Sequence, residues 1–330
     1  MDPITRQVAL ASAGAGVETI DDVFSVDLYT GSSSGNTVSN GINLSGEGGL
    51  VWLKNRDNAN NHYLFDTNRG ALNVLFADSI LYQQSGISNS LTAFNSNGFT
   101  LGGNGNINNQ GDDFVAWTLR KAPKFFDVVT YSGNWTARTI AHNLGSVPGF
   151  IWVKDLSDNN NWYCYHPTIG NERVLHLDSN YHQLYRGAGA WNSTDPTSSV
   201  FSLGTDNEVN RSGHTYVAYL FAEDENFIKC GSYIGNGTTS NTVNVGFEPQ
   251  YLLVKGAPLN FFSDWFVIDN TRGVGNGTGA VDQLLKPSRT DAEDFADYVS
   301  FTSTGFTVNT TVSTVNQNAV TYVYMAIAAP

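Results

Sequence analysis

Short apolar runs separated by Gly-, Asn- and Ser-rich segments recur along the whole chain. Phe24–Tyr29 and Val128–Tyr131 alternate or cluster apolar residues, and Gly49–Lys54 and Phe150–Lys154 are compact apolar runs that end in lysine. Such runs, bounded by turn-forming residues, predict β-strands joined by tight turns. No long stretch has the 3.6-residue period of a helix, so the pattern predicts an all-β protein. Within it we expect one helical turn at Thr290–Ala296, after a threonine cap.

Five sequence markers recur in the same order, four of them in three places and one, Asp66–Gly70, in two. The first, Tyr29-Thr30-Gly31, recurs after 102 residues and after 102 more. The full series is Tyr29-Thr30-Gly31, Tyr131-Ser132-Gly133 and Tyr233-Ile234-Gly235; Val51-Trp52-Leu53-Lys54, Ile151-Trp152-Val153-Lys154 and Leu252-Leu253-Val254-Lys255; Asp66–Gly70 and Asp269–Gly273; Gly98-Phe99-Thr100, Val200-Phe201-Ser202 and Gly305-Phe306-Thr307; and Phe114–Trp117, Tyr216–Tyr219 and Tyr322–Met325. A repeated series of this length predicts tandem copies of one domain.

The repeat divides the chain into an arm and three units. We predict an N-terminal arm at 1–22, copy 1 at 23–123, copy 2 at 124–225 and copy 3 at 226–330, each copy a jelly-roll-like β-sandwich. The linkers between copies are short and charged, so we expect the copies to pack on one another.

Composition narrows the class of protein. Charged residues make up 14% of the chain, against roughly 25% in an average soluble domain. The net charge is −13 with only 17 scattered basic residues, which argues against a nucleic-acid-binding surface. No apolar run approaches the length of a membrane span, and the N-terminus lacks the basic region of a signal peptide. We therefore expect that the protein is made in a cytoplasm and does not insert into a membrane.

The repeat also lets the sequence act as its own control for candidate chemistry. Cys164 aligns with Leu64 and Cys230 aligns with Val26, so both cysteines replace aliphatic residues. Free cysteine behaves as a small apolar residue, and we expect both in the core rather than in a disulfide or as a nucleophile.

A repeated Asp-x-x-Arg-Gly motif is the best polar candidate. Asp66 with Arg69 and Asp269 with Arg272 can hold a turn through a charge-assisted hydrogen bond, and copy 2 has His166 at the aspartate position. A structural role tolerates the loss of one copy better than a reaction does, so we favour turn stabilisation and keep ligand contact as the alternative.

No arrangement of residues predicts catalysis. Carboxylate pairs such as Asp112-Asp113 do not recur in register, and the histidines have no metal-ligand spacing. We therefore expect no enzyme activity, catalytic residue, metal or cofactor. The histidines gather in copy 2 without counterparts elsewhere, which leaves a local binding function open there.

Aromatic residues beside amides and carboxylates are the remaining candidates. Trp162 and Trp265 align with positions of an apolar run, so we expect them in the core. Trp135, Trp191 and Tyr185 lie in or next to polar segments and are the candidate glycan contacts, because an aromatic face matches the C–H face of a sugar ring.

These motifs resemble a β-domain of virion structural proteins of tailed phages, especially marine cyanophages. The resemblance is strongest over copy 1 and rests on Tyr29-Thr30-Gly31, Val51–Lys54, His62–Gly70, Gly98-Phe99 and Phe114–Trp117, with Met1–Thr5 and Ser45–Gly49 in addition. The resemblance implies a virion component, either a tail fibre or receptor-binding protein, or a capsid decoration or tail-connecting protein with no ligand.

The resemblance also implies partners. An unrepeated N-terminal arm, with Ile4, Val8 and Leu10 as its apolar residues, can order on another virion protein. We expect a host surface glycan as a further partner if the protein is an adhesin. Fibres are usually trimers, and three tandem copies can also give one chain a threefold shape, so a homo-oligomer and a single chain both stay open.

Overall fold

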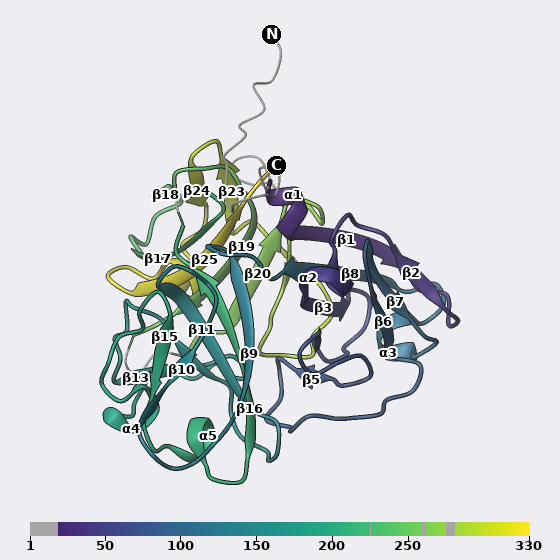
Figure 1. The fold of residues 1–330 in the computed structure, drawn as a ribbon. Helices are drawn as coiled ribbons and strands as arrows, with labels where there is room; N and C mark the ends of the chain where they lie inside the picture. The colour runs from purple at the N-terminus through teal and green to yellow at the C-terminus, as the bar shows by residue number, and fades with distance from the viewer. Residues whose placement is uncertain (1–18, 225, 259–261, 275–280) are drawn as a thin grey trace.

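Figure 1 shows the computed structural model, which describes residues 19–224, 226–258, 262–274 and 281–330. Strands account for 43% of the structure and helices for 8%, and the strands form antiparallel sheets. The all-β prediction is confirmed. Each sheet takes its strands from only one of the three predicted copies. In Figure 1, copy 1 lies at the right, copy 2 at the lower left and copy 3 at the upper left.

Copy 1 contains a large sheet of order β1-β8-β3-β4-β5 and a small sheet of order β2-β7-β6. Side chains from both sheets pack together in one apolar cluster. The elements are α1 (Ile20–Val23), β1 (Phe24–Thr30), β2 (Asn36–Val38), α2 (Leu44–Glu47), β3 (Gly49–Asn55), β4 (Tyr63–Asp66), β5 (Leu75–Phe76), β6 (Leu91–Asn95), β7 (Gly98–Leu101), α3 (Gly105–Asn108) and β8 (Asp113–Arg120).

Copy 2 repeats this plan with a large sheet of order β14-β13-β12-β11-β16-β9 and a small sheet of β10 and β15. The elements are β9 (Phe126–Ser132), β10 (Arg138–Ala141), β11 (Pro148–Asp155), β12 (Tyr163–Tyr165), β13 (Arg173–His176), β14 (Leu184–Tyr185), α4 (Ala188–Trp191), β15 (Val200–Leu203), α5 (Asn207–Asn210) and β16 (Thr215–Ala222).

Copy 3 has a large sheet of order β17-β25-β19-β20-β21-β22 and a small sheet of order β18-β24-β23. The elements are β17 (Ile228–Ile234), β18 (Asn241–Asn244), β19 (Pro249–Gly256), β20 (Trp265–Asp269), β21 (Asp282–Leu285), β22 (Asp294–Ala296), β23 (Val299–Thr302), β24 (Gly305–Val308), α6 (Ser313–Asn316) and β25 (Thr321–Ala328).

The central strands of the large sheets are buried on both faces. Every residue of β3, β11 and β19 is buried, which explains why these strands are continuous apolar runs instead of alternating ones. In β3, Val51 and Leu53 pack against the small sheet of copy 1. Leu50 and Trp52 point the other way, into a cluster that contains residues of all three copies. The copies therefore share a central core and are not separate domains with a core of their own alone.

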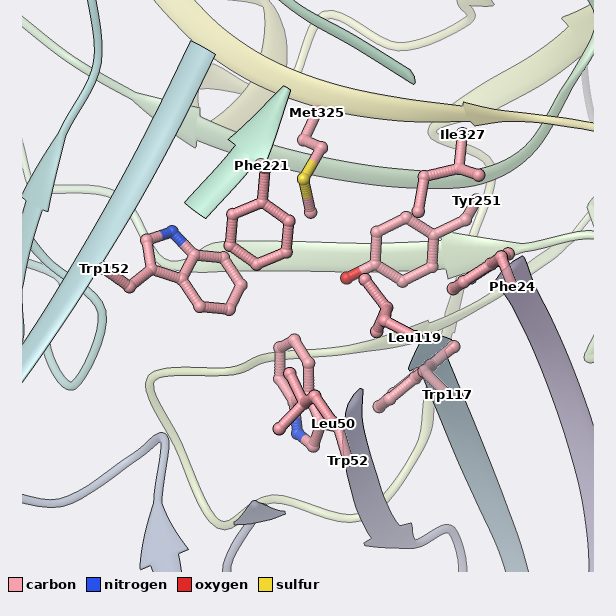
Figure 2. A pocket seen from close by; sticks show the side chains of 10 residues that line it. All are labelled: Phe24, Leu50, Trp52, Trp117, Leu119, Trp152, Phe221, Tyr251, Met325 and Ile327. Atoms are coloured by element: carbon pink, nitrogen blue, oxygen red, sulfur yellow. The ribbon is translucent and has the colours of Figure 1, made fainter. Parts of the chain in front are cut away.

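The centre of this shared core holds a small apolar cavity. Figure 2 shows side chains of all three copies converging on it: Phe24, Leu50, Trp52, Trp117, Leu119, Trp152, Phe221, Tyr251, Met325 and Ile327. Its volume is about 10 Å³, the least that a single water needs, and cavities with apolar walls stay dry. The cavity is therefore a packing gap at the junction of the copies and not a ligand site.

The prediction of a helical turn at Thr290–Ala296 is wrong. This segment contains the end strand β22, preceded by non-helical residues. Glu293 accounts for the extended path, because its carboxylate lies 2.7 Å from Arg56 of copy 1 and 3.1 Å from Arg272. A contact with another copy overrides the local helix signal.

Candidate functional site

The lysine that ends each compact apolar run joins neighbouring copies. All three lysines are fully buried, and each ammonium group donates to a backbone carbonyl of another copy. The pairs are Lys54 with Thr290 at 3.2 Å, Lys154 with Ile80 at 2.7 Å and Lys255 with Ser179 at 3.5 Å. Copy 1 thus contacts copy 3, copy 2 contacts copy 1 and copy 3 contacts copy 2, so the copies form a closed ring.

Burial changes the acidity of these lysines. Desolvation lowers the pKa of Lys54 and Lys154 to about 8 and that of Lys255 to about 7. The ammonium form is held by carbonyl groups, such as that of Asn58 at 3.0 Å from Lys54. Each ammonium group thus binds carbonyls of its own copy and of a neighbouring copy, which makes it a contact between copies.

A second set of contacts follows the same ring. Trp162 of copy 2 donates its indole N–H to the carbonyl of Phe76 in copy 1 at 2.9 Å, and Trp265 of copy 3 donates to that of His176 in copy 2 at 2.8 Å. In copy 1 the equivalent ring is His62, next to the Lys286 backbone of copy 3. Trp162 and Trp265 are fully buried, as expected for core residues.

The Asp-x-x-Arg-Gly motifs hold turns and also bind a neighbouring copy. Asp66 accepts from the backbone N–H of Arg69 at 2.9 Å and pairs with its guanidinium, and both side chains are buried. The hydroxyl of Tyr219, from copy 2, donates to Asp66 at 2.7 Å. The buried carboxylate thus accepts from three donors of the protein.

The copy 3 motif repeats the arrangement with a different donor. Asp269 accepts from the backbone of Arg272 at 2.9 Å and from its guanidinium at 2.6 Å. The third donor is the indole N–H of Trp117 in copy 1, at 3.0 Å. Trp117 and Tyr219 occupy equivalent positions in β8 and β16. Two of the three seams, the contacts between neighbouring copies, therefore share one arrangement: a buried Asp–Arg pair of one copy accepts from an aromatic side chain of the next. We call this arrangement the lock.

The seam between copies 2 and 3 lacks this lock on both sides. His166 replaces the aspartate and Met325 replaces the tyrosine or tryptophan. His166 is fully buried and its ring packs 4.8 Å from Phe150, and burial lowers its pKa to about 3. Neither an aspartate acceptor nor a tyrosine or tryptophan donor is therefore present at these two positions.

A buried asparagine in each copy is a structural marker that the sequence reasoning missed. Asn108, Asn210 and Asn316 end the short helices α3, α5 and α6 and are fully buried. Each side chain donates to two backbone carbonyls and accepts from the turn that follows the Tyr-x-Gly marker. The signal was present as a repeated Ile/Val-Asn pair, hidden in an asparagine-rich chain.

The cysteines and histidines form no reactive site. Cys164 and Cys230 are buried free thiols, and burial raises the pKa of both. In the described parts of the chain, no group of three His, Cys, Asp or Glu side chains is placed to hold a metal ion. No helix among the same residues is long and apolar enough to cross a membrane.

Trp135 has an exposed aromatic ring that the turn carrying it does not require. Its side chain is 53% exposed, whereas the other six tryptophans are 2% exposed or less. Its backbone has φ +57°, a conformation that is strained for a bulky residue. The equivalent positions hold Ser33 at φ +54° and Gly237 at φ +67°, so the turn itself does not need an aromatic ring.

Polar groups extend from Trp135 towards a second exposed ring. The indole N–H of Trp135 donates to the side chain of Asn207 at 3.1 Å. The next residue back, Asp206, lies 3.9 Å from the guanidinium of Arg186, which follows Tyr185, a ring that is 63% exposed. We call these five residues the copy 2 tip.

The carboxylate of Glu208, next to the tip, has a raised pKa. Burial and a hydrogen bond to Asp206 raise the pKa of Glu208 to about 7. Near neutral pH Glu208 therefore carries its proton for part of the time, which reduces the negative charge next to Asn207.

Trp191 is the candidate glycan contact that the structure contradicts. The ring is 2% exposed and packs edge-on against Tyr165 at 5.9 Å. Its indole N–H donates to the Arg173 carbonyl at 3.0 Å. The helical turn α4 carries the ring inward from a polar segment, so the expectation for Trp191 is wrong. Trp135 and Tyr185 keep exposed faces, and the arm residues Ile4, Val8 and Leu10 lie outside the described residues.

Comparison with known proteins identifies the family. No curated protein and no solved structure matches this chain. The family described as "Domain of unknown function (DUF7483)" matches residues 20–330, which span all three copies and leave out most of the predicted arm. The chain belongs to the DUF7483 family.

Proposed function

We propose that this chain is a non-catalytic virion structural protein of a tailed phage, a tail fibre or receptor-binding component that contacts a host surface glycan. The copy 2 tip is the contact site, and the N-terminal arm attaches the protein to other virion proteins. The resemblance to phage virion domains supports the class. The tip supports the adhesin function over decoration without a ligand.

One observation carries the glycan contact. Trp135 is exposed and strained at a turn that the other copies build with Ser33 and Gly237. Backbone strain of this kind, about 1–3 kcal/mol, is retained mainly where it serves a function. The turn does not require the ring, because the other copies build it with serine and glycine, and tryptophan beside amide and carboxylate groups suits the C–H face and hydroxyls of a sugar.

Trp135 also provides the test. Because it is the exposed tryptophan among seven, a bound sugar should shield it from acrylamide and change the quenching of intrinsic fluorescence. The full chain and a Trp135→Ser variant, which carries the residue of copy 1, are screened on a printed glycan panel. We expect the full chain to bind at least one glycan class and the variant to lose that binding.

Trp191→Phe is the matched control, because it changes a buried tryptophan in the same copy. We expect it to keep glycan binding. If no glycan binds either chain, and cryo-EM of the particle places all three copies flat on the capsid or inside the tail, the protein is a decoration or connecting component and the adhesin proposal is refuted.

A further inference from the structure

We propose that the glycan is anionic, with its sugar ring on Trp135 and a carboxylate or sulfate group on Arg138 and Arg211. This inference rests on the proposed function, because it names the ligand class of the same site. It concerns two arginines that lie on either side of the Trp135 turn.

Three positions around one turn differ together between copy 2 and its sister copies. The turn is the same in all three, because Ser33, Trp135 and Gly237 each donate a backbone N–H to the carbonyl of the buried asparagine. The first residue of the following strand is Asn36, Arg138 or Asn241. The residue after the short helix is Asn109, Arg211 or Gln317.

The backbone at these positions does not require arginine. Asn109, Arg211 and Gln317 have nearly identical dihedral angles, with φ −65°, −65° and −63° and ψ 136°, 131° and 133°. Neutral amides in two copies therefore show what the fold needs. Copy 2 alone adds an aromatic ring and two positive charges around this turn.

Arg211 is accessible to a ligand, and Arg138 is partly exposed beside the same turn. Arg211 pairs with Asp158 at 3.2 Å, but the two side chains are 40% and 52% exposed, and exposed ion pairs are worth only about 0–1 kcal/mol. An incoming anion can replace Asp158 with little loss. Arg138 is half-buried, lies 5.7 Å over the Tyr131 ring and donates one N–H to the Ser132 carbonyl, which fixes its direction.

Arginines beside the two exposed rings suit an anionic ligand. Arg138 and Arg211 flank the Trp135 turn, and Arg173 lies 5.7 Å over the ring of Tyr185, with Arg186 next in the sequence. Asp158 and Asp206 lie close to Arg211 and Arg186, and the pKa of Glu208, raised to about 7, leaves this carboxylate partly protonated near neutral pH. Guanidinium groups match the planar geometry of carboxylate and sulfate oxygens.

The test compares three polysaccharides of known charge with the full chain. Alginate oligosaccharides carry carboxylates, dextran sulfate carries sulfates and dextran is neutral. Arg138→Asn and Arg211→Gln introduce the residues of the sister copies, so both variants should fold. Arg289→Asn is the control, because Arg289 is a 46% exposed arginine of copy 3 that pairs with Asp264 at 2.8 Å.

We expect alginate or dextran sulfate to bind more tightly than dextran, and Arg138→Asn and Arg211→Gln each to weaken that binding roughly tenfold, the effect of one charge-assisted hydrogen bond. Arg289→Asn should leave it unchanged. The stronger of the two anionic probes tells whether a carboxylate or a sulfate is preferred.

Two results overturn the inference. An equal loss with Arg289→Asn means that binding follows net charge and not the tip. Neutral glycans that bind as well as anionic ones, with Trp135→Ser still abolishing the interaction, refute the anionic class and leave the proposed function standing. If Trp135→Ser changes no binding to any probe, the proposed function fails as well.

Discussion

The lock between copies 1 and 2 gives the sharpest prediction about stability. Tyr219→Phe removes a single hydroxyl group and keeps the ring that packs in the shared core. In the native chain this hydroxyl donates to Asp66 at 2.7 Å and accepts from Arg69 at 3.2 Å. All three side chains are buried, so water cannot replace the lost group.

The size of the effect follows from the partners that remain. A hydrogen bond to a charged group contributes about 1.5–3 kcal/mol. Asp66 still has the guanidinium of Arg69, and Arg69 still donates to the Leu64 carbonyl at 2.9 Å. Neither charge is left alone, so we expect the free energy of unfolding to fall by about 2 kcal/mol and not by the larger amount that an orphaned buried charge would cause.

Guanidinium-induced unfolding, followed by far-UV circular dichroism, measures this change. Met325→Leu is the matched control, because Met325 occupies the equivalent position in the seam without a lock, and such apolar exchanges cost less than about 1.5 kcal/mol. Since the copies share one core, we also expect a single transition that Tyr219→Phe shifts as a whole. A loss below about 0.5 kcal/mol would refute the lock, and separate transitions for the copies would refute the shared core.

Three further predictions concern other parts of the chain. Gly31→Ala should destabilise by about 1–3 kcal/mol, because its Cβ would lie 2.0 Å from the Asn109 carbonyl oxygen, whereas Gly35→Ala, 3.9 Å from its nearest neighbour, should change the unfolding midpoint little. Trp135→Gly should keep or raise the free energy of unfolding because it relieves the strained φ, whereas Trp191→Ala should lower it by about 3–5 kcal/mol. The same denaturation assay tests both variants. A large loss of stability in Trp135→Gly would show that Trp135 is structural. Raising the pH from 7 to about 9.5 should increase stability: the folded-state pKa values of Lys54, Lys154 and Lys255 lie below the usual 10.5, so the unfolded chain binds more protons in this window. Unfolding curves at the two pH values measure the slope, and stability that is flat or falls between them would contradict it.

The repeat made much of the fold predictable because its markers are positions that the backbone demands. Tyr29 shows why: its hydroxyl donates to the Ile107 carbonyl at 2.7 Å, as Tyr131 and Tyr233 do to theirs. The glycine two residues later allows the chain to pass a carbonyl oxygen. Such local requirements survive divergence and can be recognised in a single sequence.

The contacts between copies could not be predicted in the same way. A strand such as β3 is apolar on both faces, and its sequence does not tell which face meets its own small sheet and which meets another copy. The Asp66 motif illustrates this, because its turn is local and predictable, but its third donor, Tyr219, lies 153 residues away. The burial of Trp191 could not be predicted for a related reason: its polar neighbours hide a turn that carries the ring inward.

The division between shared core and free tips explains where a function can evolve in this chain. Inner faces are constrained because residues there contact other copies, as Tyr219 contacts Asp66. The turns that follow β1, β9 and β17 contact no other copy through the hydrogen bonds that hold them, and their buried asparagines fix the backbone. Residues such as Trp135 and Arg211 can therefore change without repacking the core. We propose that this divergence, in one copy of three, serves a partner outside the chain.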